Sequence, residues 1–313
     1  MAYPRGGQPV TAKRGLWLTW LGWLLVAVLL GGAVAWIGPG RLLAPWLAID
    51  PLALVVALLL MVASYLIRTL RITRYFHTTL VGHFWSAFRL SSWHNLMNNL
   101  LPMRSGEAAF PVLMQRYYGL PAVRSVPVLL WFRLLDLQVV LLIGLAVGGH
   151  LLGIPTGPLF LMMIGLLLAP LVAYRLRGWL RARWTGGEGR VARTLAVMLD
   201  SLPDRRSRFV ATLFWTWANW LVKLAALGWV LAALAPVTFV EGVLGAIGGD
   251  LTTVLPIHAP GGFGTYEAGV ALLLGPVVAD ARLVLAAAVN LHLFVLGTAL
   301  LAAGLSLGIP RPR

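Results

Sequence analysis

Two short stretches place charged and conformationally flexible residues together in otherwise apolar surroundings. One is NNLLPMRSGEAAF, residues 98–110, and the other is LPIHAPGGFGTYEAG, residues 255–269. Each contains Leu-Pro, then a polar break, then a glutamate at the start of a new helical run. The N-terminus of a helix carries free N–H groups and about half a positive charge, which favours anions. The two stretches therefore predict a pair of anion-binding helix starts.

In the first stretch, Arg104 adds a full positive charge to the predicted helix start. We expect the Ser105 hydroxyl to cap the helix that Gly106 and Glu107 open. Such a site would suit a lipid phosphate. In a simpler interpretation, proline and glycine only let the chain turn sharply, and the glutamate balances the dipole of its own helix.

In the second stretch, Thr265 is the expected cap of a helix that opens near Glu267, and His258 lies directly before the break. Glycines at three positions permit a ligand to approach the backbone closely: Gly261, Gly262 and Gly264. Sharp turning and anion binding both explain this composition, and the two interpretations stay open here.

Three carboxylates stand out, because a charge at mid-depth in a membrane is costly and usually functional. Glu107 and Glu267 can bind a cationic headgroup, carry a proton or pair with an arginine, and the sequence leaves these roles open. The candidate partners are Arg104 and Arg133. Arg133 and Asp136 lie three residues apart and therefore share a helical face. They predict an internal ion pair that lines a cavity, with direct contact between Arg133 and substrate as the alternative.

Polar residues also recur at helical spacing in two further segments, and each set falls on one face. One set is Thr212, Thr216, Asn219 and Lys223, and the other is Ser91, His94, Asn95 and Asn98, followed by Asn99. A pore-lining face and ordinary helix packing explain the first set equally well. The histidines show no metal-binding spacing, cysteine is absent, and no catalytic motif occurs. We therefore predict no metal site, no cofactor and no enzymatic activity.

The elements that position these residues follow from composition. Of 313 residues, 59% are hydrophobic and only 11% are charged, against roughly 25% charged residues in a soluble domain. This composition indicates an integral membrane protein, so the net charge of +15 indicates topology and anionic headgroups rather than nucleic acid. Apolar runs of about 20 residues predict full transmembrane helices: residues 16–37, 51–67, 126–149, 156–174, 209–234 and 281–307.

The first run also has features of a secretory signal peptide, because Ala33-Val34-Ala35 matches the pattern of a cleavage site. Its apolar core is longer than the roughly 7–15 residues of a signal peptide, so we expect an uncleaved span. Basic residues concentrate before this span and in residues 175–208. By the positive-inside rule, both termini are expected in the cytoplasm, in a bacterial inner (plasma) membrane.

Two segments remain, residues 80–119 and 241–280, and the charges balance only if each begins and ends on one side. Helical arms at residues 107–118 and 241–255 are about 18 and 22 Å long, too short for a hydrocarbon core of about 30 Å. The arm at residues 80–100 is long enough to span, but its serine, histidine and asparagine content favours an interfacial start. We therefore predict two re-entrant helical hairpins, which with their flanking spans form an inverted repeat. The predicted fold is an all-α polytopic membrane protein with about six full transmembrane helices and two such hairpins.

We expect a single transmembrane domain over residues 1–313. Its parts are an N-terminal tail with the first span (1–50), a first half with its hairpin (51–150), a basic cytoplasmic loop (175–208) and a second half with its hairpin (209–313).

Three motifs carry a resemblance to the lysylphosphatidylglycerol synthase transmembrane region family of flippase-like membrane proteins. They are NNLLPMRSGE (98–107), RLLD (133–136) and PGGFGTYEA (260–268), and the similarity covers most of the chain from Leu52 onward. The resemblance implies movement of aminoacylated phosphatidylglycerol or other anionic lipids between leaflets. By motif position it points to Asn98, Asn99, Pro102, Arg104, Gly106, Glu107, Arg133, Asp136, Gly261, Gly262, Gly264 and Glu267.

The chain departs from that family in two ways. Relatives often carry an arginine a few residues after Gly-Glu, where this chain has Phe110 and Pro111, so one cationic contact to a headgroup is missing. The soluble aminoacyltransferase domain of lysyl-lipid synthases is also absent from this sequence. We therefore do not expect this chain to synthesise aminoacyl lipids.

The expected function is a lipid translocase that moves an anionic or aminoacylated phospholipid, or a lipid-linked intermediate, between leaflets. The alternative is a non-transporting membrane protein that binds lipid for a glycosyltransferase or a lipid synthase. The expected lipid-binding residues are Asn98, Asn99, Arg104, Gly106, Glu107, Arg133, Asp136, Asn219, Lys223, His258, Gly261, Gly262, Gly264 and Glu267.

Overall fold

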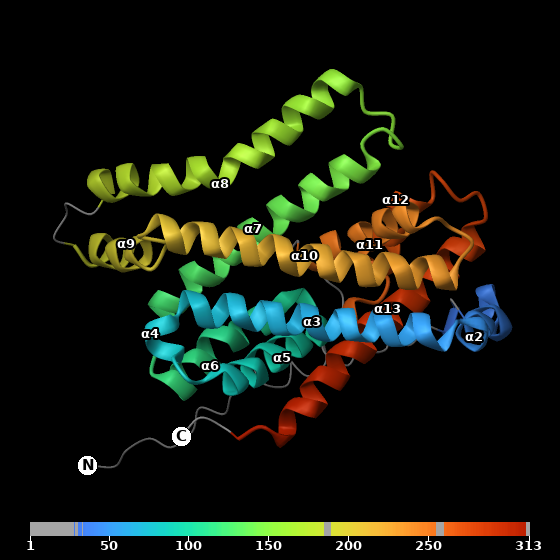
Figure 1. The fold of residues 1–313 in the computed structure, drawn as a ribbon, viewed down its shortest axis with the longest axis horizontal. Coiled ribbons are helices and arrows are strands. Elements are labelled where there is room, and N and C mark those ends of the chain that lie inside the picture. The colour runs from blue at the N-terminus through green and yellow to red at the C-terminus, as the bar shows by residue number, and fades with distance from the viewer. Residues whose placement is uncertain (1–27, 29–30, 33, 185–188, 255–259, 311–313) are drawn as a thin grey trace, which may run out of the picture.

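A computed structural model of the protein describes residues 28, 31–32, 34–184, 189–254 and 260–310. These residues form helices joined by short connections (Figure 1). Among them, five helices are long and apolar enough to cross a membrane: α3 (Pro51–Tyr75), α7 (Ala122–Gly148), α8 (Thr156–Trp184), α10 (Arg206–Leu234) and α13 (Ala281–Leu305). They confirm five predicted spans. Most of the remaining one, residues 16–37, lies outside the described residues.

The shorter elements lie between these spans. The α-helices are α2 (Pro39–Ala48), α4 (His77–Leu80), α5 (Phe84–Leu100), α6 (Ala109–Tyr118), α9 (Arg190–Asp200), α11 (Phe239–Val254) and α12 (Thr265–Leu274). Three 3-10 turns join or end them: η1 (Pro102–Ala108), η2 (Pro260–Gly262) and η3 (Ser306–Gly308). The basic segment 175–208, expected as a loop, is therefore helical over most of its described length, because α8 continues to Trp184 and α9 follows.

Helix α3 is longer than its apolar run, which stops at residue 67. Its start is well defined, because Pro51 occupies the first turn and the Asp50 carboxylate accepts the Leu52 N–H at 3.0 Å. Its last turns carry Arg68, which donates to Asn95, and Arg71, which pairs with Asp136, and the helix continues to Tyr75. This extension brings two arginines to the interior of the bundle.

Both segments that were expected to be interrupted consist of a helix, a break and a second helix. Pro102 ends α5, because a residue before proline disfavours the helical conformation, and Leu101 is accordingly extended. Gly106 allows η1 to fold back, since a Cβ there would lie 2.5 Å from the Asn98 nitrogen. In the second segment, Gly261, Gly262 and Gly264 have φ values of 65°, 76° and 82°, which favour glycine.

Helices α3 and α10 pack along each other, and the remaining elements are arranged around this pair (Figure 1). Helix α5 packs on α3, and α11 packs on α10. Helix α7 contacts α10 and α11, whereas α13 contacts α3 and α5. Helices α6 and α12 pack on α7 and α13, and the two breaks, η1 and η2, contact each other. The interrupted segments therefore meet inside the bundle.

The spans differ in how far they are enclosed. Helix α13 is the most enclosed of the five, with 72% of its apolar window buried, whereas only 11% of the α8 window is buried. Helix α8 exposes large apolar side chains such as Phe160 and Leu161, as expected for a helix that faces lipid. Helices α3, α5, α7, α10, α11 and α13 therefore form the core that can hold a polar site.

Candidate functional site

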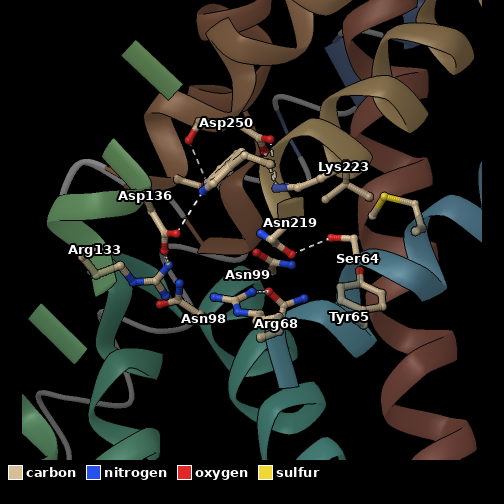
Figure 2. Close-up of a pocket in the computed structure, with 15 residues that line it drawn as sticks. Ser64, Tyr65, Arg68, Asn98, Asn99, Arg133, Asp136, Asn219, Lys223 and Asp250 are labelled. Atoms are coloured by element: carbon tan, nitrogen blue, oxygen red, sulfur yellow. Dashed lines mark hydrogen bonds and ion pairs between the residues drawn. The ribbon is translucent and has the colours of Figure 1, made fainter. Parts of the chain in front are cut away.

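A small polar cavity lies where these core helices meet, near the middle of α3, α7 and α10 (Figure 2). Its volume is about 40 Å³, which suffices for a few water molecules but not for a lipid headgroup. The lining residues are Met61, Ser64, Tyr65, Arg68, Asn95, Asn98, Asn99, Arg133, Asp136, Asn219, Trp220, Lys223, Asp250, Thr253 and Val295. Most of them are polar or charged, although the surrounding bundle is apolar.

Asp136 is the most strongly bonded carboxylate of the cavity. Its two oxygens accept from both terminal nitrogens of Arg71, at 2.6 and 3.3 Å, and the Trp220 Nε1–H donates to it at 2.9 Å. Arg133 lies 3.6 Å away. The predicted Arg133–Asp136 pair is present, but the two-pronged bond from Arg71 on α3 is the stronger contact because paired N–H groups match a carboxylate.

Glu107 extends this network toward the first break. Its carboxylate lies 2.7 Å from the terminal nitrogen of Arg133 and 3.4 Å from His94 Nε2. Arg133 thus contacts two carboxylates, Glu107 and Asp136. Of the roles left open for Glu107, pairing with Arg133 is the one seen in this conformation.

The polar face predicted on α10 lines the cavity in part. Asn219 accepts a hydrogen bond from the Ser64 hydroxyl at 2.9 Å, and the Lys223 ammonium pairs with Asp250 at 2.9 Å. Thr216 accepts from Arg71 at 3.0 Å. Thr212 bonds to the carbonyl of the preceding turn and does not line this cavity. The stripe therefore serves both helix packing and the cavity wall.

The amide residues of α5 provide the wall opposite α10. Asn95 accepts from Arg68 at 2.7 Å. Asn98 and Asn99 also line the cavity, and the buried Asn98 Oδ1 has no hydrogen-bond partner among the described residues. A buried carbonyl oxygen without a partner is destabilising unless a donor reaches it. A water molecule or a bound group in the cavity can therefore donate a hydrogen bond to this oxygen.

The second break forms a separate centre. The Glu267 carboxylate accepts from the Gly264 N–H at 2.7 Å and contacts His292 Nδ1 at 2.7 Å. The His292 ring stacks on Tyr266, with ring centres 4.6 Å apart. Glu267 thus balances the start of its own helix, which was the simpler of the two interpretations of this stretch.

Two predicted caps are wrong. Helix α6 begins later than expected, with Ala108 at its cap position and no side-chain bond, because residues 102–108 form the 3-10 turn η1. The Ser105 hydroxyl therefore does not cap α6. The cap of α12 is Gly264, whose N–H is satisfied by Glu267, while Thr265 donates to the Gly262 carbonyl.

The structure brings together only part of the predicted set. The central cavity collects Asn98, Asn99, Arg133, Asp136, Asn219 and Lys223. Glu107 and Gly106 lie in the adjoining turn η1. Glu267 and Gly264 line a different, mainly apolar pocket, and Gly261 and Gly262 form the turn before it. The Arg104 side chain and His258 lie outside what the structure describes.

Several cavity residues were not found by sequence reasoning. Arg68 and Arg71 lie beyond the predicted span of residues 51–67, yet the Arg71 side chain is only 3% exposed. Ser64, Arg68 and Arg71 have i, i+4, i+7 spacing and therefore share one helical face. That spacing was the available signal. Asp250, which follows two glycines in α11, was also missed.

Comparison with known proteins identifies a family. A family model described as "Lysylphosphatidylglycerol synthase TM region" matches residues 19–303 of the chain. No curated protein and no solved structure matches the chain significantly.

Within the described residues, no group of three or more histidine, aspartate or glutamate side chains is placed to hold a metal ion.

Proposed function

The chain belongs to the lysylphosphatidylglycerol synthase TM region family, which is associated with lipid modification and translocation, and we propose that it moves an anionic phospholipid between membrane leaflets. The chain is a multi-pass membrane protein. We propose a bacterial inner membrane with both termini in the cytoplasm, because basic residues flank the spans on that side. In this proposal the chain is a transporter and not an enzyme.

The observation that carries the proposal is the charged cavity at mid-length of the spans. Charged groups at this depth are costly, and they usually mark the path of a substrate. Four cations line or adjoin the cavity, Arg68, Arg71, Arg133 and Lys223, against the carboxylates of Asp136, Glu107 and Asp250. Among the described residues, Arg68 donates to the Asn95 amide and pairs with no carboxylate. The remaining positive charge matches the single negative charge of a phosphodiester.

The pattern of helix contacts supports an inverted repeat. Exchanging α3 with α10, α5 with α11, α6 with α12 and α7 with α13 turns four helix contacts into four others that are present: α3–α5 into α10–α11, α5–α6 into α11–α12, α6–α7 into α12–α13, and α3–α13 into α10–α7. Likewise, α7 contacts α11 while α13 contacts α5. The exchange also relates two ion pairs. Glu107 contacts Arg133 and Glu267 contacts His292, and these basic residues occupy the same position counted from the start of α7 and of α13.

The lengths of α5 and α11 support two re-entrant hairpins. Helix α5 has 17 residues and α11 has 16, or about 24–26 Å each, less than a hydrocarbon core of about 30 Å. Both end at a break, and the breaks touch. Non-helical backbone is tolerated at membrane depth where protein buries it or where it lines a polar cavity. We propose that both helices enter from opposite sides and turn back at the cavity.

The cavity is closed in this conformation, because about 40 Å³ does not hold a headgroup. Transport then requires one half to move against the other around the site, as in transporters built from inverted repeats. During this movement the lipid phosphate competes with Asp136 and Asp250 for their cationic partners. The acyl chains remain in the bilayer.

The test is lipid movement in liposomes that contain the purified protein and fluorescent phosphatidylglycerol. Arg68→Gln is the informative variant, since its partner Asn95 is neutral and no carboxylate loses its counter-ion. We expect translocation to fall at least about tenfold, as for one charged hydrogen bond. Arg193→Gln, in the exposed part of α9, is the matched control. Equal rates for wild type, Arg68→Gln and the control would refute the site.

The same assay separates transport from the alternative of a lipid-binding partner. A partner of a glycosyltransferase or lipid synthase would retain phosphatidylglycerol during purification but would not move it in liposomes. A wild-type protein that binds but does not translocate would favour that alternative. A protein that accelerates exchange between leaflets on its own would exclude it.

A further inference from the structure

A second, larger pocket lies at the end of α3 and the beginning of α10, apart from the central cavity. Its volume is about 350 Å³, within the range of small-molecule sites. Arginines from both helices line it, and no carboxylate does: Arg71 and Arg74 come from α3, Arg208 lies in the first turn of α10, and Arg205 precedes that helix. The pocket is therefore a concave site with one sign of charge.

Two of these arginines lack a balancing carboxylate. Arg208 pairs with Asp204 at 2.9 Å, and Arg71 pairs with Asp136 at 2.6 Å. Among the described side chains, no carboxylate lies within 4.0 Å of Arg74 or Arg205. The start of α10 has no side-chain cap, so its free N–H groups add partial positive charge at the same end. The pocket thus has an excess of positive charge.

Arg71 forms the inner wall and links the two sites. Its terminal nitrogens bond Asp136, which lines the central cavity, and Thr216. Its Nε is buried and has no hydrogen-bond partner among the described residues. Leaving a buried, charged donor unpaired is destabilising, so an acceptor that reached this nitrogen would be stabilised. Arg71 would thus separate a phosphate in this pocket from the central cavity.

The outer wall favours a lipid over a soluble anion. Trp215 of α10 lines the pocket and is half-buried. Its neighbours on the same helix, Val210 and Phe214, are 51% and 61% exposed. An apolar flank beside a basic pocket suits a ligand with both acyl chains and a charged headgroup, and tryptophan is enriched where proteins meet the membrane–water interface.

We propose that this pocket binds the phosphate of an anionic phospholipid before the headgroup reaches the central cavity. Arg74 and Arg205 hold the phosphate, Arg71 lies at the inner wall, and Trp215 contacts an acyl chain. Release of Arg71 from Asp136 then lets the headgroup pass inward. The site extends the proposed function, but binding is measured without transport, so the two can fail separately.

The experiment measures retained phosphatidylglycerol in the full-length protein in nanodiscs of phosphatidylcholine doped with phosphatidylglycerol, by native mass spectrometry. The test variant is Arg74→Gln with Arg205→Gln. The control variant is Arg190→Gln with Arg193→Gln, which removes the same charge from exposed positions of α9. We expect at least about tenfold weaker retention in the test variant, from two charged hydrogen bonds, and little change in the control.

The possible outcomes decide among the interpretations. Equal loss in both double variants would mean general attraction to a basic surface and would overturn the proposal, as would unchanged retention in the test variant. Inorganic phosphate and glycerol 3-phosphate are added as competitors. If either displaces phosphatidylglycerol at similar concentration, the pocket binds soluble phosphate and the lipid assignment fails.

Discussion

Replacing Asp136 by asparagine tests the pairing at the centre of the protein. Asp136 accepts two bonds from Arg71, at 2.6 and 3.3 Å, and one from Trp220, at 2.9 Å, while Arg133 lies at 3.6 Å. Asp136→Asn leaves the charge of Arg71 buried without its carboxylate. Breaking a buried pair on one side typically costs about 3–5 kcal/mol. We expect that loss in the free energy of unfolding.

The magnitude depends on burial, so the control is an exposed pair. Asp200 lies 3.1 Å from Arg181, but the two side chains are 48% and 53% exposed. An exposed ion pair contributes at most about 1 kcal/mol. Asp200→Asn should therefore change the stability little, although it removes the same charge from the same kind of pair.

The assay is denaturant unfolding in mixed micelles, followed by tryptophan fluorescence and size-exclusion chromatography. Arg71→Met combined with Asp136→Asn completes a double-mutant cycle. The double variant contains neither charge, so no buried charge is left without its partner. Its loss in the free energy of unfolding should therefore be about 2–3 kcal/mol smaller than the sum of the two single losses. Strict additivity, or an Asp136→Asn loss as small as that of Asp200→Asn, would refute the assignment of this pair.

Two further predictions concern the interrupted segments. A Cβ at Gly269 would lie 2.3 Å from the Gly248 carbonyl oxygen, whereas one at Gly297 meets nothing within 4 Å. Gly269→Ala should therefore lower the free energy of unfolding by about 1–3 kcal/mol, and Gly297→Ala should not. Equal thermal stability of the two variants would contradict the close packing of α11 on α12. The chain has no cysteine, so single cysteines can report topology with an impermeant thiol reagent. The test positions are exposed: Val81 and Ala122 around the first segment, and Val240 and Ala279 around the second. Each pair should react from one side only, the two pairs from opposite sides, and labelling of either pair from both sides would contradict the re-entrant hairpins.

The sequence by itself determined the elements of this fold. Five apolar runs became spans because burying about 20 apolar residues in a bilayer requires no information from the rest of the chain. The two interruptions have equally local causes. Pro102 disfavours the helical conformation of Leu101, and the glycines at 261, 262 and 264 adopt positive φ values. The Arg133–Asp136 contact was also accessible, since residues three apart on a helix are neighbours.

Only the tertiary structure decided which charges meet. Arg71 and Asp136 lie on different helices, as do Lys223 and Asp250, and no local pattern specifies which helix faces which. Glu107 and Glu267 have similar sequence contexts, yet one contacts an arginine at the cavity and the other caps its own helix. An ion pair depends on distances of a few ångströms between side chains far apart in the chain. The packing of α3, α7, α10 and α11 sets those distances, and the cavity exists only because these helices cross at their charged residues.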